Sequence, residues 1–168
     1  MTAKEYLWQI ERWKQKIEWI NNSSTEKIER LNQKIDMLYN QAMGMKAITY
    51  DKDRVQISPQ NSLPEIIVLI DETSKEYAKA ITTERLKADR DIAKLQQKID
   101  LIVSQIESLD DHRFVEVLRH RYLYGKRWEQ IAIDMKYAFR HVTRLHGQAL
   151  AAFTARYKDV LSCPKKQC

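Results

Sequence analysis

Apolar side chains recur every three or four residues along most of the chain, the spacing of helices that bury one face. Over residues 3–45 they keep a heptad register, although Asn21 and Ser24 place polar side chains within it. Ser23, followed three residues later by Glu26, is also a capping-box pair. The segment is therefore either one helix with a polar layer or two helices that meet near Asn21–Ser23. We expect one continuous or kinked helix, because the register survives the interruption.

A second apolar register predicts another long helix that begins near Pro64. Ser62 with Glu65 marks its entry, and proline favours the first turn of a helix. Two long helices joined by residues 46–63 predict an all-α chain with a coiled-coil-like antiparallel helical hairpin over residues 1–110. The apolar positions of the second register are Ile67, Ile81, Ala88, Ile92, Leu95, Ile99, Ile102, Ile106 and Leu109.

Two tryptophans predict a further exposed face on the first long helix. Trp8 and Trp19 are eleven residues apart, so they share a face of a continuous helix, away from the stripe of Leu7, Ile10 and Ile17. One contact between two helices cannot bury both faces. Packing within a bundle or a homodimer would cover the tryptophans, and the alternative is a docking surface for another protein.

The connection at residues 46–63 is long for a helical hairpin, and long loops are often functional or disordered. Residues 54–58 alternate like a short extended strand that Pro59 ends. Asp51 and Asp53 supply two carboxylates but lack the glycine and further acids of a calcium loop, so we predict no metal site there. We expect an ordered loop that packs on the helices.

Residues 125–150 predict two shorter helices across a short turn, the pattern of a helix-turn-helix. The first helix runs from about Arg127 to Met135 and buries Trp128, Ile131, Ala132 and Met135. The second buries Val142, Leu145, Ala149 and Phe153.

The opposite face of the second helix is small apart from its arginines, so it could enter a major groove. Arginine there pairs with guanine or grips a phosphate, while the alternative is an ordinary solvated helix. A glycine inside a helix costs about 1 kcal/mol relative to alanine. Gly147 either lets the helix lie close to DNA or marks a kink or an early end. The expected base-facing residues are Arg140, Thr143, Arg144 and Gly147, and the expected phosphate or flanking contacts are Lys126, Arg127, His141 and Gln148.

The positive charge is concentrated in the same region. The 168 residues carry a formal net charge of +6. Residues 111–168 hold twelve Lys and Arg against five Asp and Glu, whereas residues 1–110 hold seventeen against eighteen. All four histidines also lie in the C-terminal third. This asymmetry is the footprint expected of phosphate binding.

The residues of other common chemistries are missing from the sequence. Cys163 and Cys168 lack the two further ligands of a zinc site, so we expect free thiols. The sequence has no phosphate-cradling glycine loop and no recognisable catalytic order, so we expect neither an enzyme nor a cofactor. Met1–Glu5 leads directly into an amphipathic pattern, and no apolar stretch approaches the roughly 20 residues of a membrane span. We therefore expect a cytoplasmic protein.

Two stretches carry a more specific pattern: Gly125-Lys126-x-Trp128-Glu129-x-Ile131-Ala132, and Arg140-His141-Val142-Thr143-Arg144-Leu145-His146-Gly147-x-Ala149-Leu150. They resemble region 4 of bacterial sigma factors. The chain is still more similar to a family of small phage and prophage proteins of Gram-positive bacteria, related to autolysin-regulator-type late transcription regulators. Those proteins join a sigma-like helix-turn-helix to a long helical N-terminal part. The resemblance covers about residues 108–155 and, more weakly, Tyr50–Pro59.

The sequence departs from that family at two expected helix N-caps. Such proteins usually have a small hydroxyl residue where Arg127 and Ala138 stand. Loss of a cap typically costs about 1 kcal/mol, so the helix starts are expected to fray or to be capped otherwise. Arg127 could instead add a phosphate contact.

The favoured interpretation is a phage or prophage transcription regulator that binds double-stranded DNA through a helix-turn-helix at residues 111–160. We expect a homodimer through the long helices and a flexible basic tail at residues 161–168. Contact with RNA polymerase is a further implication of the resemblance. The first alternative is a coiled-coil adaptor that binds polymerase or a phage protein without specific DNA readout, which the absent caps and the Trp8/Trp19 face favour. A third is a small terminase-like packaging protein.

Overall fold

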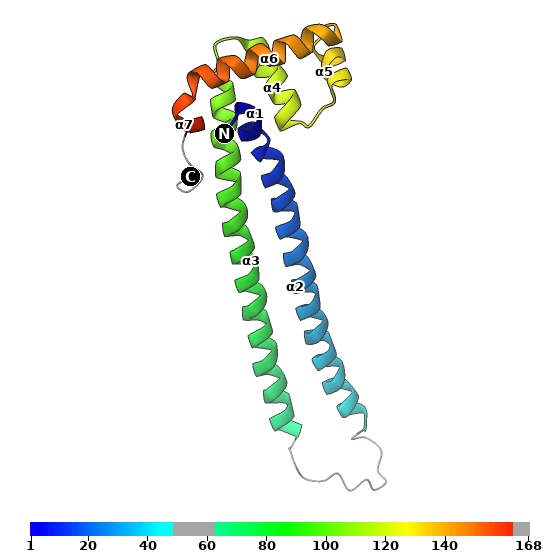
Figure 1. Cartoon of the computed structure of the whole chain (residues 1–168). Helices are drawn as coiled ribbons and strands as arrows, with labels where there is room; N and C mark the ends of the chain where they lie inside the picture. The colour runs from blue at the N-terminus through cyan, green and yellow to red at the C-terminus, as the bar shows by residue number, and fades with distance from the viewer. Residues whose placement is uncertain (49–62, 163–168) are drawn as a thin grey trace. The chain divides into compact units, whose positions relative to one another are not determined.

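The computed structural model describes residues 1–48 and 63–162, with the side chains at 41–48 and 63–66 left out. Every regular element in these ranges is a helix, which confirms the all-α class (Figure 1). The elements are α1 (Ala3–Leu7), α2 (Gln9–Ile48), α3 (Leu63–Glu107), α4 (His112–Leu118), the π-helical turn η1 (Arg119–Leu123), α5 (Trp128–Asp134), α6 (Phe139–Arg156) and α7 (Lys158–Ser162).

The chain divides into two compact units. Unit 1 comprises Met1–Glu18 and Ile92–Cys168, and unit 2 comprises Trp19–Asp91. The sequence placed a boundary at residue 110, whereas unit 1 takes in the start of the chain and the end of α3. The reason is packing, because Ile102 and Ile106 of α3 belong to the same buried cluster as Leu7 and Ile10.

The start of the chain is a short capped helix followed by a break. Thr2 and Glu5 form a capping box, in which the Glu5 N–H donates to Thr2 Oγ1 (3.2 Å) and the Thr2 N–H donates to Glu5 Oε2 (2.9 Å). α1 ends at Leu7, and α2 begins after Trp8. α2 then continues through Asn21–Ser23, as expected. The first helix is therefore interrupted at Trp8, not near Asn21.

Packing within a bundle, one of the covers expected for the two tryptophans, is found for Trp8 and not for Trp19. Trp8 is partly buried, and its ring meets the edge of Tyr122 with centroids 5.7 Å apart. This contact holds Trp8 at the break between α1 and α2, so the helical spacing from Trp8 to Trp19 does not apply. Trp19 is 67% exposed.

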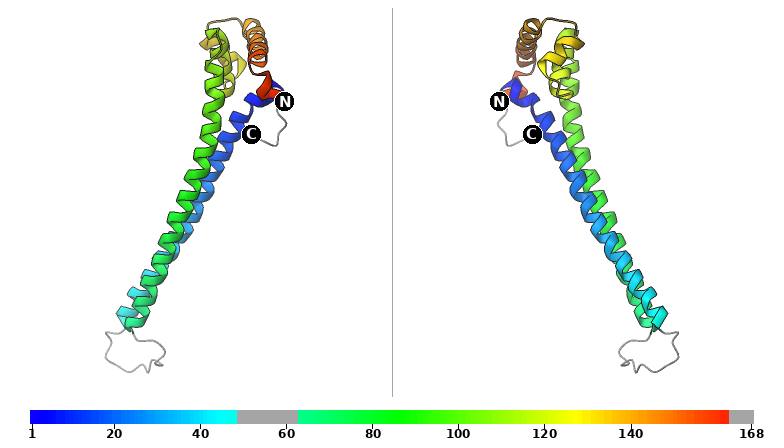
Figure 2. Two further views of the ribbon diagram at one scale, coloured as in Figure 1. Left: turned by 90° about the vertical axis from the view of Figure 1, so that its left-hand side faces the viewer. Right: turned by 90° about the vertical axis from the view of Figure 1, so that its right-hand side faces the viewer.

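In unit 2, α2 and α3 run antiparallel side by side (Figures 1 and 2). Lys27 forms an ion pair with Glu84 (2.8 Å), and the Lys34 Nζ lies 5.8 Å from the ring centre of Tyr77. From the first contact to the second, the residue number rises by seven in α2 and falls by seven in α3, as expected for antiparallel helices. The buried side chains described in this unit are all small, namely Ser24, Ser74 and Ala88.

Ile67 does not occupy the buried position that the sequence predicted for it. Its side chain is 46% exposed, and Ile70 is the half-buried residue of that turn. Apolar residues run consecutively from 66 to 70 and surround the helix. Periodicity alone therefore could not choose the inward residue.

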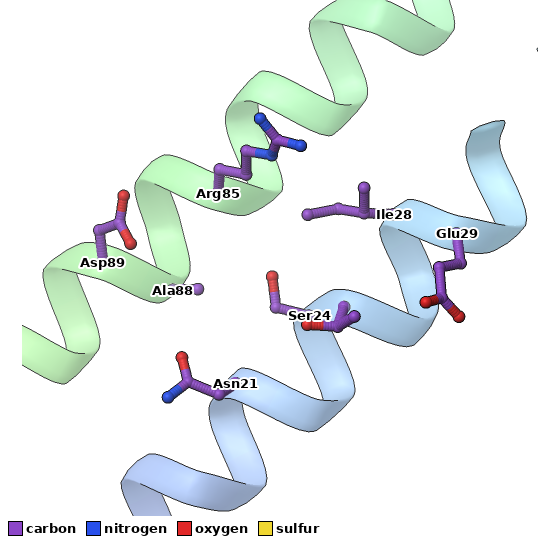
Figure 3. A pocket seen from close by; sticks show the side chains of 8 residues that line it. Asn21, Ser24, Ile28, Glu29, Arg85, Ala88 and Asp89 are labelled. Carbon is purple, nitrogen blue, oxygen red and sulfur yellow. The ribbon is translucent and has the colours of Figure 1, made fainter.

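A polar gap of about 260 Å³ lies between the two helices of unit 2 (Figure 3). Asn21 and Ser24 line it from α2, and Arg85, Ala88 and Asp89 line it from α3. The polar layer expected at Asn21 and Ser24 is therefore present. Ile28 is the one large apolar side chain among the residues that line this gap.

Unit 1 has an extensive apolar core. The large side chains that are fully buried come from every part of the unit: Leu7, Ile10, Ile102, Ile106, Val117, Leu118, Ile131, Val142 and Phe153. Tyr6 ties α1 to this core, because its ring lies 6.1 Å from that of Phe153 and its hydroxyl donates to Gln105 Oε1 (3.0 Å). The N-terminal segment is therefore an integral part of the unit.

A compact connection leads from α3 to α5. Asp111 caps α4 by accepting a hydrogen bond from the Arg113 N–H (2.9 Å). α4 continues into η1, and the chain turns at Gly125, whose φ of 63° lies in the left-handed region that glycine tolerates. This turn leads the chain into α5, which packs against α6.

The ends of two predicted segments shift. The basic tail was expected from residue 161, but Leu161 and Ser162 belong to α7, and Leu161 is buried and accepts a hydrogen bond from the Met1 amino group (3.1 Å). The 46–63 connection loses residues 46–48 to α2 and Leu63 to α3. The predicted strand at 54–58, the Tyr50–Pro59 segment and the remainder of the tail lie outside the described residues.

Candidate functional site

Helices α5 and α6 form the pair that the sequence predicted, joined by Met135–Ala138. The turn is closed by a hydrogen bond from the Tyr137 N–H to the Ala132 carbonyl (3.0 Å). Lys136 has a φ of 56°, which is uncommon for a residue with a side chain. This left-handed residue reverses the chain direction and sets the start of α6.

The inward face of α6 is the predicted one. Val142, Leu145, Ala149 and Phe153 are all buried in the core cluster, which confirms the apolar stripe. In α5, Ile131 and Ala132 are buried, whereas Trp128 and Met135 are half-buried. α6 is thus anchored along its whole length.

The outward face of α6 carries the proposed base-reading residues. Arg140, Thr143, Arg144 and Gly147 are exposed on it. Of the expected flanking residues, Gln148 and Arg127 are exposed, while His141 and Lys126 are half-buried. Arg144 Nη2 lies 3.1 Å from His141 Nδ1, so this histidine steadies the guanidinium.

Some cations of unit 1 pair with a carboxylate and others do not, and those on this face belong to the second group. Arg113, Arg119, Arg156 and Lys126 each pair with a carboxylate: Asp111, Glu107, Asp110 and Asp134 respectively. Within the described ranges, Arg127, Lys136, Arg140 and Arg144 have no such pair. The positive charges of these four side chains on the α5–α6 surface are therefore not paired with a carboxylate of the described residues.

The expected N-caps are occupied by residues that provide no side-chain cap. Neither the Arg127 side chain at the start of α5 nor the Ala138 side chain at the start of α6 accepts a hydrogen bond from a backbone N–H of its helix. At α5 the Gln130 side chain accepts one from the Arg127 N–H (3.1 Å), which replaces part of the missing interaction. Both helices nevertheless begin where the sequence placed them.

Gly147 is not explained by packing within the chain. A Cβ at this position would meet no atom within 4 Å. α6 also continues to Arg156, so the alternative that Gly147 marks an early helix end is wrong. An alanine would fit and would favour the helix by about 1 kcal/mol.

An aromatic and cationic cluster supports α6 from behind. The Arg121 guanidinium lies between Trp8 and Trp128, 5.4 and 4.6 Å from their ring centres, and donates to the Lys126 carbonyl (2.9 Å). His146 packs edge-on against Trp128 (4.8 Å) and lies 3.1 Å from the Tyr122 hydroxyl. These contacts fix the angle between α5, α6 and the start of the chain.

Burial perturbs the titration of this cluster. It lowers the pKa of His146 to about 4, assisted by the charges of Arg121 and Lys4. Burial also raises the pKa of the Tyr122 hydroxyl to about 12. His146 is therefore neutral at pH 7 and serves as a packing residue.

A second histidine, His120, is half-buried within η1. Burial lowers the pKa of His120, and the nearby Lys126 charge adds to this effect. Its Nδ1 has no hydrogen-bond partner among the described residues and lies 4.0 Å from the Asp134 carboxylate. The hydrogen bond from Lys126 (2.8 Å) lowers the pKa of Asp134, so this carboxylate is already committed to a cation.

Sequence reasoning missed Phe139. Its side chain is 47% exposed at the first position of α6, beside Arg140, and lies outside the core cluster. The helical wheel offered no clear signal, because Phe139 precedes Val142 by three residues and lies at the edge of the buried stripe. The role of the first eighteen residues in supporting this site also had no clear signal.

Two further features are absent from the described residues. No group of three or more His, Cys, Asp or Glu side chains gathers there as a metal site would require. None of the helices in these ranges has the length and apolar character to cross a membrane.

Comparison with known proteins identifies no relative. No family model matches the chain, and neither a curated protein nor a solved structure matches it.

Proposed function

We propose that this chain is a DNA-binding transcription regulator that places α6 in the major groove. The observation that carries the proposal is the set of unneutralised cations on the exposed α5–α6 surface, above a helix that is firmly anchored on its other side. DNA presents closely spaced phosphates and guanine acceptors to such a surface. The resemblance to sigma region 4 gives the same expectation.

Arg140 and Arg144 are the principal base-reading residues of the proposal. They are one helical turn apart and exposed, so both guanidinium groups can reach neighbouring base pairs. Arginine pairs with the O6 and N7 acceptors of guanine through two hydrogen bonds. Thr143 lies between them, and Gly147 removes bulk one turn further along.

The flanking residues would contact phosphates. Arg127 lies exposed at the start of α5 and has no carboxylate partner among the described residues, so its charge is available. Lys126 would first have to leave Asp134, which makes it a weaker phosphate ligand. His141 can orient Arg144, and Gln148 extends the row of hydrogen-bonding side chains.

Selection of bound sequences from a random DNA pool tests the proposal. The wild-type chain should enrich one guanine-containing motif. The double variant Arg140→Ala/Arg144→Ala should lose that enrichment while keeping its helical circular dichroism spectrum. Failure of the wild type to enrich any motif would contradict the proposal.

A protein adaptor is the second candidate, and unit 2 provides the observation in its favour. Met37, Val68 and Leu69 are more than half exposed, although each is large and apolar. Such residues could join two copies in a homodimer or bind RNA polymerase. Light scattering of the chain, alone and with purified polymerase, would detect either complex. Stable complex formation together with no DNA selection would favour this candidate.

A further inference from the structure

Two parallel rows of side chains follow the exposed face of α6. Residues four apart lie one above the other on a helix. Phe139, Thr143 and Gly147 form the first row, which is apolar or small. Arg140, Arg144 and Gln148 form the second row, which donates hydrogen bonds.

Phe139 is exposed without a structural reason inside unit 1. It lies outside the core cluster, and about half of its side chain faces solvent. Its two chain neighbours are the N-cap Ala138 and the unpaired Arg140. The ring is therefore an apolar group set directly beside the cationic row.

Thr143 presents its methyl group in the same row. Its hydroxyl is turned back on the helix, where it lies within hydrogen-bond distance of the carbonyls of Phe139 (3.3 Å) and Arg140 (3.0 Å). The donor is used within the helix, so the side chain has its methyl group and an acceptor oxygen left for an external contact.

The major groove contains one apolar group, the 5-methyl of thymine, next to the hydrogen-bonding edges of the bases. We propose that Phe139 and Thr143 recognise thymine methyl groups beside the guanines that Arg140 and Arg144 contact. The two rows then read adjacent base pairs by different chemistry. This inference rests on the proposed DNA-binding function, and it adds a residue that the cationic surface alone does not require.

Replacement of thymine by deoxyuridine isolates the methyl group, because the hydrogen-bonding edges stay the same. In the selected motif, each thymine is replaced in turn, and the dissociation constant is measured by fluorescence anisotropy. One buried methyl group contributes about 0.8 kcal/mol, so at one or two positions the wild type should bind about fourfold more weakly.

The matched variants assign this loss to the apolar row. Thr143→Ser keeps the hydroxyl group of the side chain but removes the methyl group. At one of the sensitive positions, Phe139→Ala or Thr143→Ser should bind the thymine-containing and deoxyuridine-containing DNA with equal affinity. The control Ile133→Ala removes an exposed apolar residue of α5 and should keep the discrimination. All three positions are exposed, so the variants should fold, and circular dichroism checks this.

The outcomes separate the inference from the function on which it rests. Specific binding with no thymine–deoxyuridine difference at any position, or a motif without thymine, overturns the inference and leaves the DNA-binding function intact. Discrimination that survives in both variants also overturns it. Absence of DNA binding by the wild type overturns both.

Discussion

The two compact units bury very different side chains. Unit 1 encloses a continuous core of large aliphatic and aromatic residues, whereas the buried side chains described in unit 2 are two serines and an alanine beside a polar gap. Burial of a large apolar side chain contributes about 1.5–3 kcal/mol, and a small one contributes far less. The comparison indicates that the candidate DNA-binding surface is held rigidly, while the paired helices of unit 2 are held weakly.

Truncation of a core side chain should show the largest difference in stability between the two units. Phe153→Ala removes a fully buried ring that contacts Tyr6 and Tyr157, and it should lower the free energy of unfolding of unit 1 by about 3–5 kcal/mol. Leu31→Ala at a half-buried position of unit 2 should cost about 1 kcal/mol. Urea denaturation followed by circular dichroism measures both, and equal losses would contradict the comparison.

The Arg121 cluster should contribute a smaller amount to unit 1. Arg121→Met keeps the alkyl stem but removes the cation between Trp8 and Trp128, and it should destabilise the chain by about 2 kcal/mol. Arg113→Met, which breaks an exposed ion pair, should have a much smaller effect. Thermal denaturation compares the two, and a larger loss in Arg113→Met would sink the idea that Arg121 joins α1 to α5.

Acid should weaken unit 1 through its histidines. His146 has a folded pKa of about 4 against an unfolded value near 6.5, so the unfolded state binds more protons between these pH values. The stability that neutral His146 provides is thus present above about pH 6.5 and is lost as pH falls towards 4. Melting temperatures from pH 7.5 to 4.5 should fall less steeply in His146→Gln than in the wild type.

Two observations make this pH dependence specific. Unit 2 contains no histidine, so it should not share this part of the acid effect. His112→Gln, at a side chain that is 83% exposed, is the matched control for replacing a histidine. An unchanged profile in His146→Gln would refute the role of burial.

The smallest effect is expected at Gly147, where glycine makes unit 1 less stable than alanine would. Gly147→Ala should raise the free energy of unfolding by about 1 kcal/mol, because nothing obstructs the new Cβ. The same variant should bind DNA more weakly if this face lies close to the bases. Higher stability with unchanged affinity would remove Gly147 from the proposed interface.

The sequence predicted the elements better than their grouping. Regular apolar spacing located the buried stripe of α6 and the continuity of α2, because each depends on local periodicity. The break at Trp8 and the exposure of Ile67 were missed, since the first depends on a contact with Tyr122 and the second lies in a fully apolar run. The inclusion of residues 1–18 in unit 1 likewise depends on contacts between residues far apart in sequence.

In the candidate site, too, local spacing predicted some features and contacts between distant residues determined others. The exposed positions of Arg140, Thr143 and Arg144 follow from the helical wheel. The pairing of Lys126 with Asp134 could not be predicted, because it requires the fold of the turn around Gly125. The exposed Phe139 was overlooked because apolar residues are ordinarily assigned to a core.

The most direct test of DNA binding through α6 is the affinity for the selected DNA as a function of salt. Arg140→Ala/Arg144→Ala should weaken binding at least about 30-fold, since each bidentate contact contributes about 1–3 kcal/mol. Arg113→Ala/Arg156→Ala removes the same charge from arginines that are already ion-paired, so its affinity should stay close to that of the wild type. Wild-type binding should also weaken steeply as salt rises. Equal losses in the two double variants, or wild-type affinity independent of salt, would contradict the account.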